Sequence, residues 1–253
     1  GERKLLELLG AASLKAWEAE DMPLAHAASA ALLSYAEHTQ GRNLTHIHAI
    51  QVQRDDELIA LPLATRRNLE LIKTLRGEDS PTVFSLLDTC MTGMGSRLLK
   101  TWLLEPERNR KSAMQRLEAI GVLRGTGAGM TPWQALRSEL KGVSDVERIT
   151  ARIALRQVRP RELVGLSKTL QKSQLLAQSG KAPSAYLTQV FTDLIPPQGC
   201  AELLASAIME EPAALVRDGG VIATGFDAEL DELRAIQNNC DEFLLELESK
   251  EKL

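Results

Sequence analysis

The fold of this chain is constrained most by short segments whose apolar residues recur at three- and four-residue spacing. That spacing places the apolar side chains on one face of an α-helix. A parallel sheet would need longer runs of β-branched residues, and the sequence has none. The chain is therefore predicted to be mainly α-helical and to consist of many helices. Segments of this kind, joined by short breaks with Gly, Pro or Ser, cover residues 83–87, 98–104, 114–123, 132–140, 146–155 and 160–176.

Other segments extend the helical prediction. Pro23 suits the first turn of a helix, and strong helix formers continue to about His38. Apolar residues with helical spacing predict another helix from Ala64 to Gly77. A further helix is expected over residues 201–210.

Two short β-hairpins are expected between these helices. Residues 47–52 and 58–61 are rich in β-branched and apolar side chains, and a polar stretch separates them. Asp218-Gly219 stands between β-branched residues, which is typical of a tight turn, so residues 215–222 predict a second hairpin.

The last segment predicts a long projecting helix. Its apolar stripe begins at Phe226 and is still running where the sequence stops at Leu253. A helix of about 27 residues would measure roughly 40 Å. Because an exposed apolar stripe is costly, we expect the natural polypeptide to continue and return along this helix, or another chain to cover it.

Composition excludes several classes of function. The net charge is −4, so no global field attracts a polyanion. Three cysteines fit neither a disulfide framework nor a zinc pattern. No apolar stretch reaches 18 residues, and the N-terminus lacks a signal-peptide core, so we expect a soluble cytoplasmic protein without membrane contact.

No complete catalytic or cofactor site can be assembled from the sequence. The phosphate-binding pattern G-x-x-x-x-G-K-[ST] is absent, and the glycines at 125, 127 and 129 are interpreted as a helix-connecting loop. His46 and His48 would share one strand face, yet no third metal ligand is convincing, so we interpret them as surface histidines. We predict no catalytic residue, cofactor or metal in this chain.

A series of arginines is the best candidate for binding a polyanion. Arg148, Arg152, Arg156 and Arg159 recur at a spacing that would place them along one helix face. They could contact DNA phosphates, or they could form ion pairs with the neighbouring Asp145, Glu147 and Glu162; we favour the ion pairs.

Several strings, in order, closely resemble the MutS family of bacterial DNA mismatch-recognition proteins. They are ATRRNLEL (64–71), SLLD (85–88), TGMGSRLL (92–99), WLLEP (102–106), DVERI (145–149) with Ala151-Arg152, RPREL (159–163), RDGGVI (217–222) and ELDELR (229–234). Pro62 is a departure: the family commonly has an acidic residue two places before the Ala-Thr pair, and here the helix near Ala64 lacks that cap.

The resemblance implies a domain organisation. Residues 1–21 would end a connector domain, residues 22–225 would form the helical core domain, and residues 226–253 would begin a lever helix that leads to a clamp domain outside this chain. The chain would be a non-enzymatic segment that couples the DNA clamp to an ATPase domain elsewhere in the parent.

The resemblance also implies partners and structural residues. The parent would bind mismatched double-stranded DNA, ATP and Mg²⁺, form a homodimer and work with MutL. Within the family motifs we expect Thr65 to cap or bond back into its helix, Asn68 to bond the neighbouring hairpin, and Gly93 and Gly95 to permit close helix approach. The motif residues given structural roles are Thr65, Arg66, Asn68, Glu70, Gly95, Arg97, Asp218, Gly219 and Gly220.

Two other functions stay open. The arginine face from Arg148 to Arg161 could make this a helical domain that binds DNA backbone directly. Alternatively, the stripe from Phe226 to Leu247 could make it a scaffold for protein partners.

Overall fold

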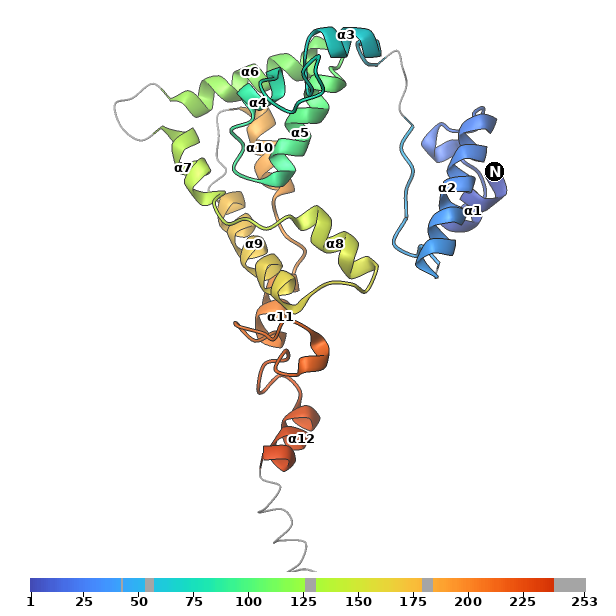
Figure 1. The fold of residues 1–253 in the computed structure, drawn as a ribbon. Coiled ribbons are helices and arrows are strands. Elements are labelled where there is room, and N and C mark those ends of the chain that lie inside the picture. Colours follow the sequence, from blue (N-terminus) through green and yellow to red (C-terminus); the bar gives the residue numbers. More distant parts are fainter. Residues whose placement is uncertain (42, 53–56, 126–130, 179–183, 239–253) are drawn as a thin grey trace, which may run out of the picture. The chain divides into compact units, whose positions relative to one another are not determined.

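The computed structural model describes the chain except for residues 42, 53–56, 126–130, 179–183 and 239–253. The described part is mainly helical, as predicted, and its β-structure is limited to isolated bridges (Figure 1). It divides into two compact units: residues 1–89 with 96–114, and residues 90–95 with 115–253.

Most helices lie where apolar spacing predicts them. The first unit contains α1 (Glu2–Leu9), η1 (Lys15–Trp17), α2 (Pro23–Gln40), α3 (Leu63–Asn68) and α4 (Val83–Leu87). Two helices, α5 (Gly93–Leu104) and α6 (Arg110–Arg124), each contribute residues to both units. The second unit contains α7 (Pro132–Glu139), α8 (Val146–Ala154), α9 (Pro160–Gln178), α10 (Ala185–Asp193), α11 (Cys200–Ala207), η2 (Val216–Asp218) and α12 (Ala228–Asn238).

In the first unit α1 packs against α2 around a small apolar core. The buried side chains are Leu5, Leu14, Ala19, Leu33 and Leu44, and Ile47, Ile50 and Val52 pack against them. Residues on both sides of position 21 share this core, and the domain boundary expected there stays a prediction.

The first predicted hairpin is wrong. Residues 47–52 form no strand, because their apolar side chains pack on the α1–α2 core instead. Leu58 forms an antiparallel bridge with Glu107, with the Ile59 amide donating to the Pro106 carbonyl at 2.8 Å. The expected turn residues 53–56 lie outside the described part.

The second predicted hairpin is also wrong. Val216–Asp218 is a turn of 3₁₀ helix, and the chain then returns to pair with a more distant partner. Ile222 forms an antiparallel bridge with Ile208, and the Met209 amide donates to the Val221 carbonyl at 2.9 Å. Val221 is buried, so its β-branched side chain is part of the apolar core and does not indicate a local hairpin.

The helix expected from Ala64 to Gly77 is shorter than predicted. α3 ends at Asn68, and Glu70 adopts a positive φ of 47°, which a helix cannot continue through. The backbone groups freed there bond elsewhere: the Glu70 and Leu71 carbonyls accept from the Val83 and Phe84 amides at 3.1 and 2.9 Å.

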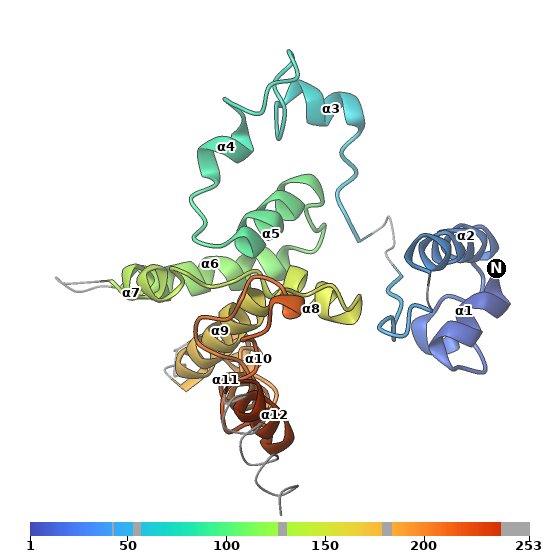
Figure 2. The same cartoon turned by 60° about the horizontal axis from the view of Figure 1, so that its bottom comes forward.

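In the second unit α9 is the central helix and packs against α8, α10 and α11 (Figures 1 and 2). Two buried hydroxyls on α9 bond to neighbouring segments: Ser167 donates to the Ala201 carbonyl at 3.1 Å, and Thr169 accepts from the Ser144 amide at 2.9 Å. A Cβ added to Gly165 would lie 2.6 Å from Ser144 Oγ, so the chain before α8 approaches α9 closely.

The long C-terminal helix is confirmed over its first part. α12 begins at Ala228, where the Asp227 carboxylate accepts from the Leu230 amide at 2.9 Å and closes the first turn. The remainder of the predicted helix, residues 239–253, lies outside the described part.

Candidate functional site

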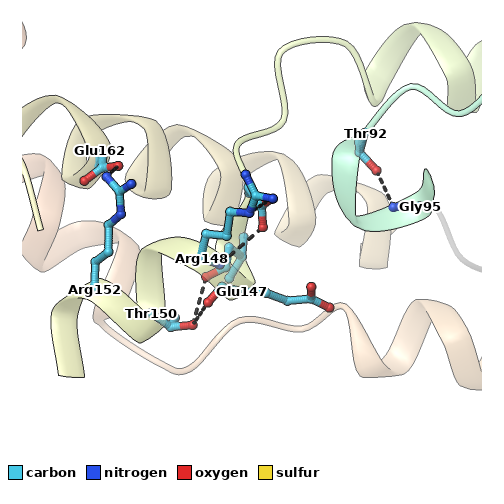
Figure 3. Close-up of polar contacts among 9 residues, drawn as sticks. Thr92, Gly95, Glu147, Arg148, Thr150, Arg152 and Glu162 are labelled. Carbon is cyan, nitrogen blue, oxygen red and sulfur yellow. Dashed lines mark hydrogen bonds and ion pairs between the residues drawn. The ribbon is translucent and has the colours of Figure 1, made fainter. Parts of the chain in front are cut away.

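The arginine series lies around the turn that joins α8 to α9. Asp145 caps α8, since its Oδ1 accepts from the Arg148 amide at 3.2 Å, and its Oδ2 lies 3.5 Å from Arg148 Nε. The Thr150 hydroxyl donates back to the Val146 and Glu147 carbonyls within the same helix (Figure 3). Arg148 is therefore held beside the carboxylate that starts its helix.

Arg152 reaches from α8 to α9. Its Nη1 donates to Glu162 Oε1 at 2.5 Å, as Figure 3 shows by the approach of the two side chains. The other oxygen of Glu162 accepts from the Arg159 amide at 2.9 Å and so caps the start of α9. One carboxylate thus satisfies a guanidinium and a helix terminus.

The four arginines do not share one helix face, and that part of the sequence interpretation is wrong. α8 ends at Ala154, and Arg156 takes a positive φ of 51° while the Gln157 amide donates to the Arg152 carbonyl at 2.8 Å. This pair of features closes the helix as a glycine would, although the residue is an arginine. A spacing measured across a helix end does not define a face.

The arginines fall into two groups. Arg148 and Arg152 have carboxylate partners, as the favoured interpretation expected. The side chains of Arg156, Arg159 and Arg161 are exposed and have no ion-pair or hydrogen-bond partner among the described residues. Whether any of these side chains contacts DNA stays a prediction.

The family-motif residues of α3 do not take the expected roles. Thr65 is the third residue of the helix, so it is not its cap; the residue in the cap position is Pro62, which offers no side-chain bond. Among the described residues no hairpin lies beside Asn68. Arg66 Nε donates to the Leu61 carbonyl at 2.9 Å, and Glu70 Oε1 accepts from the Leu75 amide at 2.6 Å, so both shape the turns around α3.

Gly95 has a local role at the start of α5. Thr92 Oγ1 accepts from the Gly95 amide at 3.1 Å (Figure 3), and a Cβ on Gly95 would lie 3.2 Å from the same oxygen. The atoms nearest to a Cβ at Gly95 thus belong to Thr92 and Cys90. Sequence reasoning missed Thr92, although a threonine just before a helix is a typical capping signal. Arg97 lies on α5, where its carbonyl accepts from the Thr101 hydroxyl at 3.2 Å.

The Asp218-Gly219-Gly220 motif forms the turn after η2. Gly219 and Gly220 have φ values of 74° and 63°, which explains glycine at both positions. The Asp218 carboxylate lies 3.7 Å from Arg217 Nε.

The same segment is tied to α12 by a residue that sequence reasoning passed over. Arg234 Nη2 donates to the Ile222 carbonyl at 2.9 Å, and its Nη1 donates to Asp231 at 3.2 Å. Asp231 in turn accepts from the Gly225 amide at 2.5 Å. These bonds fix the first turns of α12 to the loop that precedes it.

The remaining candidates from the sequence are two histidines and a glycine-rich loop. His46 and His48 lie in a stretch without strand, and no group of three or more His, Cys, Asp or Glu there could hold a metal ion. Of the glycine-rich loop at 125–129, only Gly125 belongs to the described residues. No described helix is both long and apolar enough to cross a lipid bilayer.

Comparison with models of protein families identifies a family for most of this chain. The family model described as MutS domain III matches residues 64–252. The matched range extends from α3 to α12 and includes the arginine series, the motif around Gly95 and the Asp218-Gly219-Gly220 motif.

Proposed function

The chain belongs to the MutS family of DNA mismatch-repair proteins, and from this premise we propose that it is the helical core of a mismatch-recognition ATPase together with the start of its lever. In this proposal residues 1–21 end the connector domain, residues 22–225 form the core, and residues 226–253 begin the lever towards a clamp domain. The observation that carries the proposal is the match to domain III over residues 64–252.

The proposed role is mechanical coupling. The helices around α9 are joined by buried hydroxyl bonds and by the close approach at Gly165, which favours movement as one body. The bonds from Arg234 attach the first turns of α12 to the loop before it. A displacement of the lever by DNA would then be transmitted through the core, and linkage requires nucleotide state to affect DNA binding equally.

The proposal assigns the chemistry to other parts of the parent protein. The sequence has no phosphate-binding loop of the P-loop type, so we place ATP and Mg²⁺ outside this chain and give none of its residues a catalytic role. We further propose a cytoplasmic homodimeric parent that binds mismatched double-stranded DNA and has MutL as a partner.

The coupling is tested in the full-length parent by measuring ATP affinity with and without a duplex that contains a G·T mismatch. We expect the two affinities to differ by roughly 5- to 150-fold, the usual range of coupling between sites. The double variant Ser167→Ala, Thr169→Val should reduce that factor, because it removes the two bonds that join α9 to its neighbours. Val216→Ala, at an exposed position, serves as the control. Equal ATP affinities with and without DNA in the unmodified protein would defeat the proposal.

A second function is favoured by one observation, the three exposed arginines without described partners at the α8–α9 turn. We propose, as the alternative, that Arg156 and Arg159 contact DNA phosphates directly. Fluorescence anisotropy of the 253-residue chain with mismatched and matched duplexes over a salt series separates the two functions. The coupling role predicts no binding at physiological salt. Direct contact predicts affinity that falls steeply with salt and drops further in Arg156→Glu, Arg159→Glu.

A further inference from the structure

A groove of about 550 Å³ lies beside α3 in the first unit and is not used by the proposed coupling role. Its apolar side chains are Leu63, Ile72, Leu75 and Leu104. Leu63 is 82% exposed and Leu75 54% exposed, so two leucines face solvent at the same depression. An exposed cluster of this kind is a feature of binding surfaces rather than of ordinary protein surface.

The backbone turn that forms one side of the groove is fixed by hydrogen bonds. The Leu75 amide donates to Glu70 Oε1 at 2.6 Å, which fixes the chain between α3 and Leu75. The buried Thr74 accepts from the Glu78 amide through its hydroxyl at 3.0 Å, and the Gly77 amide donates to its carbonyl at 2.9 Å. The groove is therefore a built feature of the turn that follows α3.

The charged residues that line the groove are all cations: Arg66, Arg67, Lys73 and Arg76, with no carboxylate among them. Arg66 is engaged with the Leu61 carbonyl and Lys73 with Asp79. Arg67 and Arg76 are exposed, and neither guanidinium has a hydrogen-bond or ion-pair partner among the described residues. Two unpaired positive charges thus flank an apolar floor.

We propose that this groove binds a peptide segment of a partner protein that presents leucine or phenylalanine side chains next to aspartate or glutamate. The apolar side chains of the segment would cover Leu63 and Leu75, and its carboxylates would pair with Arg67 and Arg76. A nucleic acid fits less well, because the floor is aliphatic and offers no aromatic surface on which bases could stack. The inference does not depend on the coupling role, since it concerns neither DNA nor nucleotide.

The test uses the 253-residue chain and three fluorescein-labelled probes in anisotropy titrations. The first probe is a 12-residue acidic peptide with leucines four positions apart, the second has lysine in place of each acidic residue, and the third is a DNA duplex. Arg67→Glu, Arg76→Glu is the variant, and Arg110→Glu, Lys111→Glu, at two exposed cations at the start of α6, is the charge-matched control. Circular dichroism checks that each variant keeps its helices.

The proposal expects saturable binding of the acidic peptide, with affinity about tenfold weaker in the double variant and unchanged in the control. A second variant, Leu63→Ser with Leu75→Ser, should weaken peptide binding without a change of charge. Both side chains are exposed in the free chain, so the substitutions should leave the fold intact. Equal affinities for the acidic and basic peptides overturn the proposal, as does binding of the duplex alone. An acidic peptide that binds equally well to the double variant overturns it too.

Discussion

The helices around α9 and the segment around α3 both present several arginines, yet they differ in what surrounds them. Around α9, Arg152 meets Glu162, and buried residues of α9 contact its neighbours closely. Around α3, the side chains of Arg67 and Arg76 have no partner among the described residues, and exposed leucines line the same groove.

The difference teaches that an arginine cluster has to be judged by its carboxylates and by the packing beneath it. Glu162 serves both a guanidinium and a helix terminus, so the cations beside it stabilise local structure. No carboxylate lines the groove at α3, and the side chains of Arg67 and Arg76 remain available to a partner. Three changes test this comparison, beginning with the packing around α9.

Gly165→Leu should produce the largest loss of stability. A Cβ at this position would lie 2.6 Å from Ser144 Oγ and 3.5 Å from Ser144 Cβ, so a larger side chain must displace the segment before α8. Overpacking of this kind costs about 1–3 kcal/mol of unfolding free energy. Urea denaturation followed by circular dichroism measures it.

Two further variants make this prediction specific. Gly121→Leu is the same substitution in α6, where a Cβ would meet nothing within 4 Å, and we expect no loss there. Ser144→Gly should restore part of the stability lost in Gly165→Leu, because it removes the Ser144 side chain with which the leucine would clash. Equal losses at positions 121 and 165 would show that the approach to Ser144 does not constrain α9.

Most of the helices are predictable from sequence, because each of these carries its own periodic stripe. The stripe of α9 is an example: it was expected over residues 160–176 and found over Pro160–Gln178. α10 is missed, because the sequence predicts no helix between the segment that ends at residue 176 and the one that begins at residue 201. Ser184 is in fact the cap of this helix and accepts from the Leu187 amide.

The turns were not predictable, because their bonds join residues distant in sequence. Ile222 pairs with Ile208 rather than with a neighbour across the Asp-Gly turn, and Leu58 pairs with Glu107. The end of α8 is not predictable either, because Arg156 adopts a backbone conformation that usually belongs to glycine. The arginine spacing was therefore counted across a helix end. The groove beside α3 has no sequence signature, since it depends on where that helix stops.

The Arg152–Glu162 pair should contribute a smaller amount than the packing at Gly165. Its side chains are 47% and 26% exposed, so solvent screens the attraction and we expect a coupling of about 0.5 kcal/mol. A double-mutant cycle with Arg152→Met and Glu162→Gln measures it. The coupling should fall at about 1 M salt, and Arg161→Ala should leave stability nearly unchanged. A cycle with no coupling at low salt would remove the contrast between the two arginine regions.

The smallest effect is expected at the Lys73–Asp79 pair near the groove. The hydrogen bond and charge of Lys73, 2.5 Å away, lower the pKa of the Asp79 carboxyl below its ordinary value of 3.8, and Lys100 adds to the same effect. Because the folded pKa lies below the unfolded one, the pair's contribution to stability is present above pH 3.8 and is lost as the pH falls through the lowered value. Lys73→Met should raise the pKa of Asp79 towards its ordinary value in an NMR titration, and Lys100→Met should raise it less. If neither variant moves it, Lys73 is not bound to Asp79 in solution, and the groove would have three available cations rather than two.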